Sequence, residues 1–183
     1  MIYDPSIHHR RSLRLQGYDY SKEGAYFVTV CTRNRKCLFG NITDKEMTLN
    51  DAGRMIRSIW QEFPERFPNI DVDKFIIMPN HIHAVFVIIC TGTGKSEPCV
   101  HNHDGPNGTL PDTVGRILQA YKSITTDEYI KGVRQWGWEP FNRKLWQRGY
   151  WDHIIRDEKD YNRIWEYIHD NPANWQNDPL NSL

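Results

Sequence analysis

The sequence predicts a single α+β domain, residues 1–183, in which helices pack against an antiparallel β-sheet. A chain of 183 residues typically forms one domain with a sizeable core. Short β-branched and aromatic runs alternate with longer segments whose apolar residues recur at helical spacing. Two of the short runs are separated only by Pro79 and Asn80, which indicates a turn between two antiparallel strands.

The first part of the chain predicts a strand, a small hairpin and a helix. Residues 24–32 form the strand, because they are β-branched and aromatic almost throughout. Residues 38–49 form a candidate hairpin, and a helix follows from 50 to about 67, with Pro64 disturbing its end. Five apolar residues mark the buried face of this helix: Met55, Ile56, Ile59, Trp60 and Phe63.

The middle of the chain predicts two core strands, a loop and a long helix. The strands cover 72–78 and the apolar run that ends at 89. Residues 91–110 are rich in Gly, Asn and Pro, so a flexible loop is expected there. A helix follows from 111 to about 131. Its apolar face is expected to hold Val114, Ile117, Leu118, Tyr121 and Ile124.

The last part predicts an aromatic loop at 135–149, a strand at 150–156 and a helix at 158–170. Asp157 caps this helix and Pro172 ends it. The main elements then follow the order strand, helix, strand, strand, helix, strand, helix. This is the βαββαβ pattern of ferredoxin-like folds, with the connecting helices on one face of the sheet and an added C-terminal helix.

Composition restricts the setting of the protein but not its partner. No stretch is apolar enough to span a membrane, and the first residues lack the features of a signal peptide, so a cytoplasmic protein with free thiols is expected. The 23 basic and 23 acidic residues cancel, yet basic residues concentrate in 1–36, which includes a basic arm at 1–17, and in 116–163. These regions fit either a solvated surface or a nucleic-acid-binding face, on which exposed tryptophans could stack with unpaired bases.

His81 and His83 are the first candidates for a functional site. Side chains two residues apart on a strand point to the same side, so both imidazoles can reach one metal ion while Ile82 points into the core. A second pair, His101 and His103, lies near Cys99 in the flexible loop. The loop setting and the lack of a clear fourth ligand argue against a zinc site there.

The final helix supplies the remaining candidates. Tyr167 and Asn171 are four residues apart and share one helix face, and so do Arg163 and Tyr167. A phenol can attack a phosphodiester, and a carboxamide oxygen can complete a His-His-oxygen site. Such mixed ligands suit Mg²⁺ or Mn²⁺ and also accept Zn²⁺. Tyr167 could instead be a packed aromatic residue, and His153 a core histidine or one that orients a ligand.

Four segments together resemble the REP-associated tyrosine transposases, which belong to the single-tyrosine HUH (IS200-like) transposases. The resemblance covers about residues 10–175 and is carried by YFVTVCTRNR at 26–35, MPNHIH at 78–83, LWQRGYWDHIIR at 145–156 and YIHDNP at 167–172. The resemblance implies a ferredoxin-like sheet with His81 and His83 as metal ligands. It also implies that Tyr167 is the nucleophile and that Asn171 is the third metal ligand.

The resemblance further implies a DNA transposase, an endonuclease that cleaves and rejoins single-stranded or hairpin DNA through a 5′-phosphotyrosine with Mg²⁺ or Mn²⁺. Basic residues after the first strand and near the final helix are the expected DNA contacts: Arg33, Arg35, Lys36, Arg148 and Arg163. Monomer and homodimer both remain open. The alternatives are a metal phosphodiesterase that uses water, and a domesticated single-stranded nucleic-acid-binding protein without catalysis.

Overall fold

The computed structural model of the chain describes residues 18–89 and 113–181. The expected basic arm at 1–17 and the expected loop at 91–110, including Cys99, His101 and His103, lie outside these residues. Within the described ranges, no helix is both long enough and apolar enough to cross a membrane.

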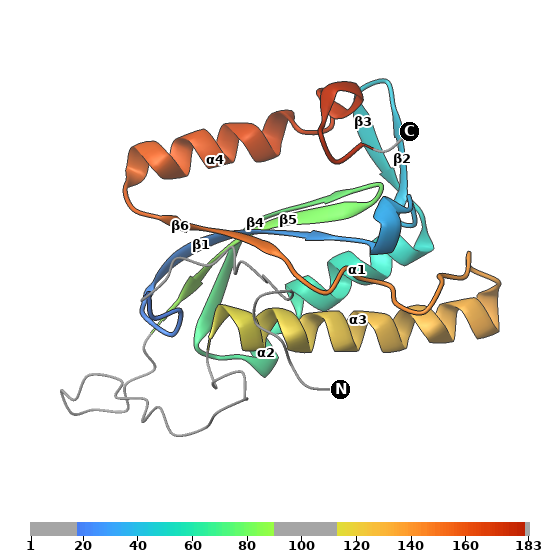
Figure 1. Ribbon diagram of the computed structural model, residues 1–183, viewed down its shortest axis with the longest axis horizontal. Coiled ribbons are helices and arrows are strands. Elements are labelled where there is room, and N and C mark those ends of the chain that lie inside the picture. The colour runs from blue at the N-terminus through green and yellow to red at the C-terminus, as the bar shows by residue number, and fades with distance from the viewer. Residues whose placement is uncertain (1–17, 90–112, 182–183) are drawn as a thin grey trace, which may run out of the picture.

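One antiparallel sheet forms the centre of the molecule (Figure 1). Its strand order is β4-β5-β1-β6, and each neighbouring pair is antiparallel. The strands are β1 (Gly24–Cys31), β4 (Ile70–Met78), β5 (His81–Ile88) and β6 (Trp151–Ile155). This order, with helices between β1 and β4 and between β5 and β6, confirms the predicted α+β ferredoxin-like fold.

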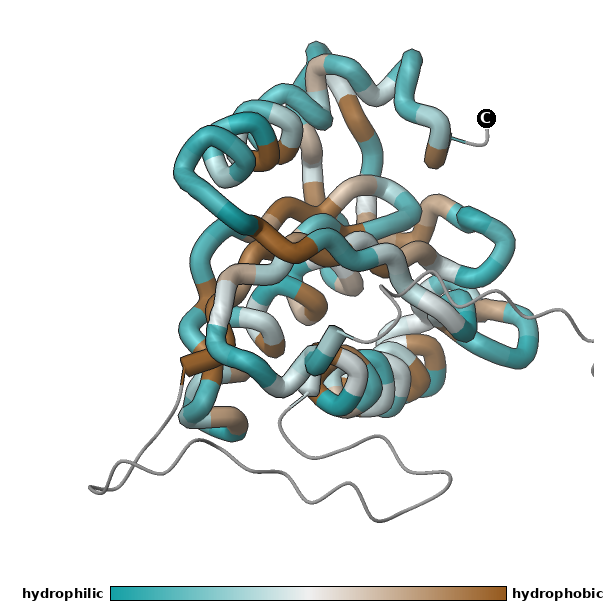
Figure 2. The backbone as a smooth tube through the Cα atoms, turned by 60° about the vertical axis from the view of Figure 1, so that its left-hand side comes forward, coloured by the Kyte–Doolittle hydropathy of each residue, from teal (hydrophilic) through white to brown (hydrophobic). Residues whose placement is uncertain are grey.

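The helices form two layers, one on each side of the sheet (Figure 1). One layer holds α1 (Asp51–Gln61), α2 (Phe63–Arg66) and α3 (Val114–Trp136). The other consists of the added C-terminal helix α4 (Glu158–Asp170). Apolar stretches of the chain gather in the strands between these layers (Figure 2).

Two helices end at other residues than the sequence predicted. The helix expected over 50–67 is divided, because α1 ends at Gln61 and Pro64 occupies the first turn of the separate helix α2. The long helix α3 continues to Trp136 and ends at Gly137, which adopts the left-handed conformation with φ 68°. The hairpin expected over 38–49 is confirmed, and it consists of β2 (Gly40–Thr43) and β3 (Glu46–Leu49) in a separate two-stranded sheet.

Alternation along β1 divides the interior into two cores. Tyr26, Val28 and Val30 belong to the larger core, which α1, α2 and α3 cover. Phe27 points to the opposite face and packs with Val85 of β5 and with two residues of α4, Ile164 and Ile168. Because His81 pairs with Cys31 and His83 with Thr29, both histidines lie on the face that α4 covers.

Candidate metal and nucleophile site

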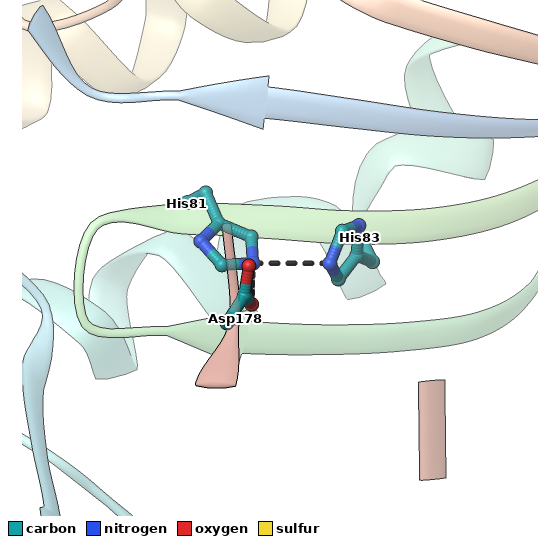
Figure 3. A group of neighbouring side chains, drawn as sticks. All are labelled: His81, His83 and Asp178. Carbon is teal, nitrogen blue, oxygen red and sulfur yellow. Dashed lines mark hydrogen bonds and ion pairs between the residues drawn. The ribbon is translucent and has the colours of Figure 1, made fainter. Parts of the chain in front are cut away.

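The two histidine rings lie side by side at the start of β5 (Figure 3). Their Nε2 atoms are 3.0 Å apart, and His81 and His83 are 0% and 1% exposed. This is the arrangement that their spacing predicted. Two metal–nitrogen bonds of about 2.1 Å at an angle between about 90° and 110° place the nitrogens about 3.0–3.4 Å apart, so the observed separation fits a shared cation.

The hydrogen bond at Nδ1 of His81 leaves the Nε2 atom of that ring with a lone pair that can bind a cation. Nδ1 of His81 lies 2.7 Å from Oδ1 of Asn80. The Asn80 amide is oriented by its own Nδ2, which donates to the carbonyls of Arg35 and Leu180 at 3.0 and 2.9 Å. The Asn80 oxygen therefore accepts the His81 Nδ1 proton, which leaves Nε2 of His81 unprotonated in the neutral ring. Nδ1 of His83 is 2.8 Å from the hydroxyl of Thr29.

Burial keeps both imidazoles neutral. Desolvation, followed by the charge of Arg35, lowers the pKa of His81 to about 3. Desolvation, followed by the charge of His81, lowers the pKa of His83 well below its ordinary value. Neutral imidazole is the form that binds metals, so the rings are in the required protonation state at neutral pH.

Asp178 brings a carboxylate to the histidine pair that the sequence analysis did not identify (Figure 3). It follows the 3₁₀ turn Trp175–Asn177, its side chain is 4% exposed, and its Oδ2 lies 3.8 Å from Nε2 of His81. Oδ1 accepts a hydrogen bond from the Leu180 amide at 2.7 Å. Oδ2 is buried and has no hydrogen-bond partner among the residues that the structure describes.

The donor set of His81, His83 and Asp178 suits a divalent cation. Their ligand atoms all lie within 4.8 Å of one another. A buried carboxylate oxygen without a hydrogen bond is unfavourable unless a positive charge compensates it, and two neutral imidazoles supply none. A cation bound by all three groups would satisfy the carboxylate and both Nε2 lone pairs together.

Asn171, the predicted third ligand, also lies at the site, but its amide nitrogen faces the histidines. Nδ2 is 3.4 Å from Nε2 of His83, and the side chain is buried. Oδ1 is buried and, within residues 18–89 and 113–181, has no partner. A half-turn about the Cβ–Cγ bond would exchange the two atoms. Asn171 therefore supplies a ligand oxygen only after that rotation, whereas Asp178 Oδ2 already lies close to the pair.

Tyr167 brings its hydroxyl to the same point from the same chain. The phenol oxygen is 3.4 Å from Nε2 of His83, and the residue is 45% exposed. Ile164 and Ile168 fix this face of α4, because they are buried against Phe27 and Val85. Desolvation, followed by the charge of Asp178, raises the pKa of Tyr167, while the hydrogen bond with Asn171 opposes the change. A nearby cation would lower this pKa.

The other tyrosine of α4 points elsewhere. The hydroxyl of Tyr161 donates to Oδ2 of Asp73 on β4 at 2.5 Å. This hydrogen bond, followed by desolvation, raises the pKa of Tyr161 to about 12. Tyr167 is thus the α4 tyrosine that lies beside the histidines.

The five predicted DNA-contacting residues lie in different surroundings. Arg33 and Arg148 border one surface hollow beside Gln147. The Arg35 guanidinium donates to the Pro179 carbonyl at 2.7 Å and so holds the segment that carries Asp178. The remaining two have charged partners, since Lys36 pairs with Glu139 at 2.7 Å and Arg163 with Asp160 at 2.6 Å.

No family model matches the chain. An uncharacterized protein of Haemophilus influenzae is 41% identical over 180 residues, which cover 97% of this chain and 96% of that protein. A putative REP-associated tyrosine transposase of the same species is 25% identical over 163 residues, 85% of this chain and 73% of that protein. The REP-associated tyrosine transposase of Escherichia coli is 24% identical over 154 residues, 84% of this chain and 69% of that protein.

A solved structure of a REP-associated tyrosine transposase bound to a REP hairpin has a similar fold. It aligns with a TM-score of 0.55 and 21% identity, over 88% of this chain and 74% of that chain.

Proposed function

We propose that the chain is a REP-associated tyrosine transposase, like the relatives of 24–25% identity, and that it cleaves and rejoins single-stranded DNA with Tyr167 as its nucleophile. The main support for this proposal is the position of the Tyr167 hydroxyl, whose oxygen lies 3.4 Å from Nε2 of His83. A nucleophile and a candidate metal site thus share one point, which is the arrangement that metal-assisted phosphoryl transfer requires.

His81, His83 and Asp178 would hold a divalent cation, with Asn171 as a further oxygen ligand after rotation of its amide. Two imidazole nitrogens and one or two oxygens suit Mn²⁺ or Mg²⁺. When bound, the cation would polarise the scissile phosphate and offset the charge that develops on it. Asn80 and Thr29 would keep the rings oriented through their Nδ1 atoms.

Tyr167 would then carry out an in-line exchange at phosphorus. A bond forms between its phenol oxygen and the phosphorus atom, and the bond to the 3′-oxygen of the preceding nucleotide breaks. The phenol proton passes to solvent, to which the residue is 45% exposed, and the leaving oxygen becomes a 3′-hydroxyl. Because the phosphotyrosine keeps a phosphodiester, a 3′-hydroxyl can attack it in the reverse step and rejoin a strand without ATP.

The proposed substrate is a single strand or the unpaired flank of a hairpin. Arg33 and Arg148 border one hollow and would contact the phosphate backbone there. Tyr167 projects from α4 toward the histidine pair on β5, where the scissile phosphate of the strand would lie. The hairpin bound in the related structure agrees with such a substrate.

End-labelled DNA tests the proposal. The protein is incubated with Mn²⁺ and a hairpin oligonucleotide that carries unpaired flanks and a label at either the 3′ or the 5′ end. A 5′-phosphotyrosine places the 3′ label on the protein in a denaturing gel and releases the 5′ label as a shorter strand. Cleavage without a protein-linked label would support a water-using phosphodiesterase, and binding without cleavage would support a non-catalytic binding protein.

A further inference from the structure

A cavity of about 810 Å³ adjoins the site between α4 and the strand β6. Tyr167 and His83 form part of its wall, and Phe27, Trp151, Ile164 and Leu180 supply apolar surface. Its volume falls in the range of about 300–1,000 Å³ that is typical of small-molecule sites. Only the wall that carries Tyr167 and His83 takes part in the proposed cleavage step.

Phe27 joins the cavity to the reacting groups. Its ring is 4% exposed and stacks on His83, with the ring centres 5.4 Å apart. It also meets Tyr167 and Trp151 edge to face, at 6.0 and 5.8 Å. A planar group stacked on Trp151 would therefore be separated from Tyr167 and His83 by the ring of Phe27 alone.

Trp151 is an exposed aromatic residue on this wall. It is 48% exposed, and its indole is parallel to the His153 ring, at 6.2 Å and 9°. Trp151 pairs with Thr29, whose hydroxyl contacts His83, so the sheet register directs the indole to the face of the site. β6 is also the edge strand of the described sheet, which leaves this side of the cavity accessible from solvent.

Positive charge lies on the same wall. Arg163 lines the cavity one helical turn before Tyr167, and its side chain is 72% exposed while it pairs with Asp160. An aromatic platform beside a basic side chain is an arrangement that binds single-stranded nucleic acid, because each nucleotide has a base with a π-face and a negatively charged phosphate.

We propose that this cavity takes one unpaired nucleobase next to the scissile phosphate, and that Trp151 is the residue that stacks on it. The inference rests on the proposed function and names a substrate contact of the same site. A base within a duplex remains stacked and paired, so the cavity would select unpaired nucleotides at the cleavage position.

A double-mutant cycle between protein and DNA tests the proposal. The ligand is a fluorescent DNA hairpin with unpaired flanks, chosen because the wild-type protein binds it. In a series of such hairpins, an abasic nucleotide replaces one flank nucleotide at a time. Dissociation constants are measured by anisotropy for the wild type, Trp151→Ala, Trp151→Phe and the control Trp136→Ala. Trp136 is 66% exposed and ends α3, which lies on the other face of the sheet.

At one flank position, Trp151→Ala and the abasic nucleotide should each weaken binding roughly tenfold, and the two together no more than either alone. Trp151→Phe should retain most of the affinity, which would show that the aromatic face is needed, and Trp136→Ala should bind as the wild type. Circular dichroism verifies that each variant is folded.

The inference is overturned if no position couples to Trp151, or if Trp151→Ala binds as tightly as Trp136→Ala. Adduct formation is scored separately on the same hairpin. Coupling without any adduct would uphold the base site and contradict the proposed cleavage. An adduct without coupling would support the cleavage and contradict the base site.

Discussion

The phenol oxygen of Tyr167 lies 3.4 Å from Nε2 of His83, although 84 positions separate the two residues. The contact depends on two elements with different periodicities. β5 directs His81 and His83 toward α4. The buried Ile164 and Ile168 fix the rotation of α4 about its axis, so that Tyr167 faces β5. The candidate nucleophile and the candidate metal ligands His81 and His83 therefore come from the same chain.

Removing the Asp178 carboxylate should weaken metal binding. Asp178→Asn keeps the shape of the side chain but removes the charge that faces His81, so the affinity for Mn²⁺ should fall roughly tenfold or more. Isothermal titration measures the change, and Asp73→Asn is the matched control, since Asp73 contacts Tyr161 instead. Unchanged Mn²⁺ affinity in Asp178→Asn would remove Asp178 from the ligand set.

Asn171→Ala separates the two oxygen candidates. If the amide stays as it lies, with its nitrogen toward His83, the loss in Mn²⁺ affinity should be smaller than that of Asp178→Asn. The same titration compares both variants. A larger loss in Asn171→Ala would mean that the amide rotates and that Asn171 is the main oxygen ligand, as the sequence predicted.

The metal-free protein should lose stability as the pH falls below about 6.5. The pKa of His81 is about 3 in the folded protein against 6.5 ordinarily, so between these values the unfolded chain binds more protons. Above pH 6.5 the neutral histidines make their full contribution to the free energy of unfolding. It declines toward pH 3, by up to about 1.4 kcal/mol per pH unit for each of the two buried histidines.

Urea unfolding in EDTA between pH 7 and 4 measures this dependence. A variant that combines His81→Gln and His83→Gln should show a shallower decline, because the remaining titrations come from other groups. Equal slopes in the two proteins would show that the buried histidines do not control the acid sensitivity.

Neutralising Arg33 should weaken DNA binding to all sequences alike. Arg33→Gln removes one phosphate contact, so the slope of log affinity against log salt should fall by about 0.7 for a single strand. Arg57→Gln is the control, since Arg57 is exposed on α1, on the other face of the sheet. Salt titrations of a single-stranded oligonucleotide would contradict the assignment if both variants had the wild-type slope.

The fold and the histidine pair of the candidate site follow from local sequence patterns. The β-branched and aromatic run at 24–32 and the turn at Pro79 and Asn80 predicted the central strands, and the spacing of His81 and His83 predicted their common face. Each of these features is a property of a few adjacent residues.

Asp178 could not be found in this way. It lies on an irregular segment after a 3₁₀ turn, where no periodicity gives the direction of a side chain. Arg35 and Asn80 hold that segment through the carbonyls of Pro179 and Leu180, and these backbone contacts leave no trace in residue types. The Arg35 bond also shows why a basic residue can be correctly placed near the site and still have a structural partner.

Peptide mapping of the covalent adduct tests the central claim most directly. Trypsin cleaves after Lys159 and Arg163, so Tyr161 falls in the peptide 160–163 and Tyr167 in 164–183, where it is the single tyrosine. Mass spectrometry of the adduct formed with Mn²⁺ and hairpin DNA should find the nucleotide mass on 164–183, and Tyr167→Phe should yield no adduct while Tyr161→Phe yields the wild-type amount. DNA attached to any other peptide, or an adduct that persists in Tyr167→Phe, would contradict the assignment of Tyr167 as the nucleophile.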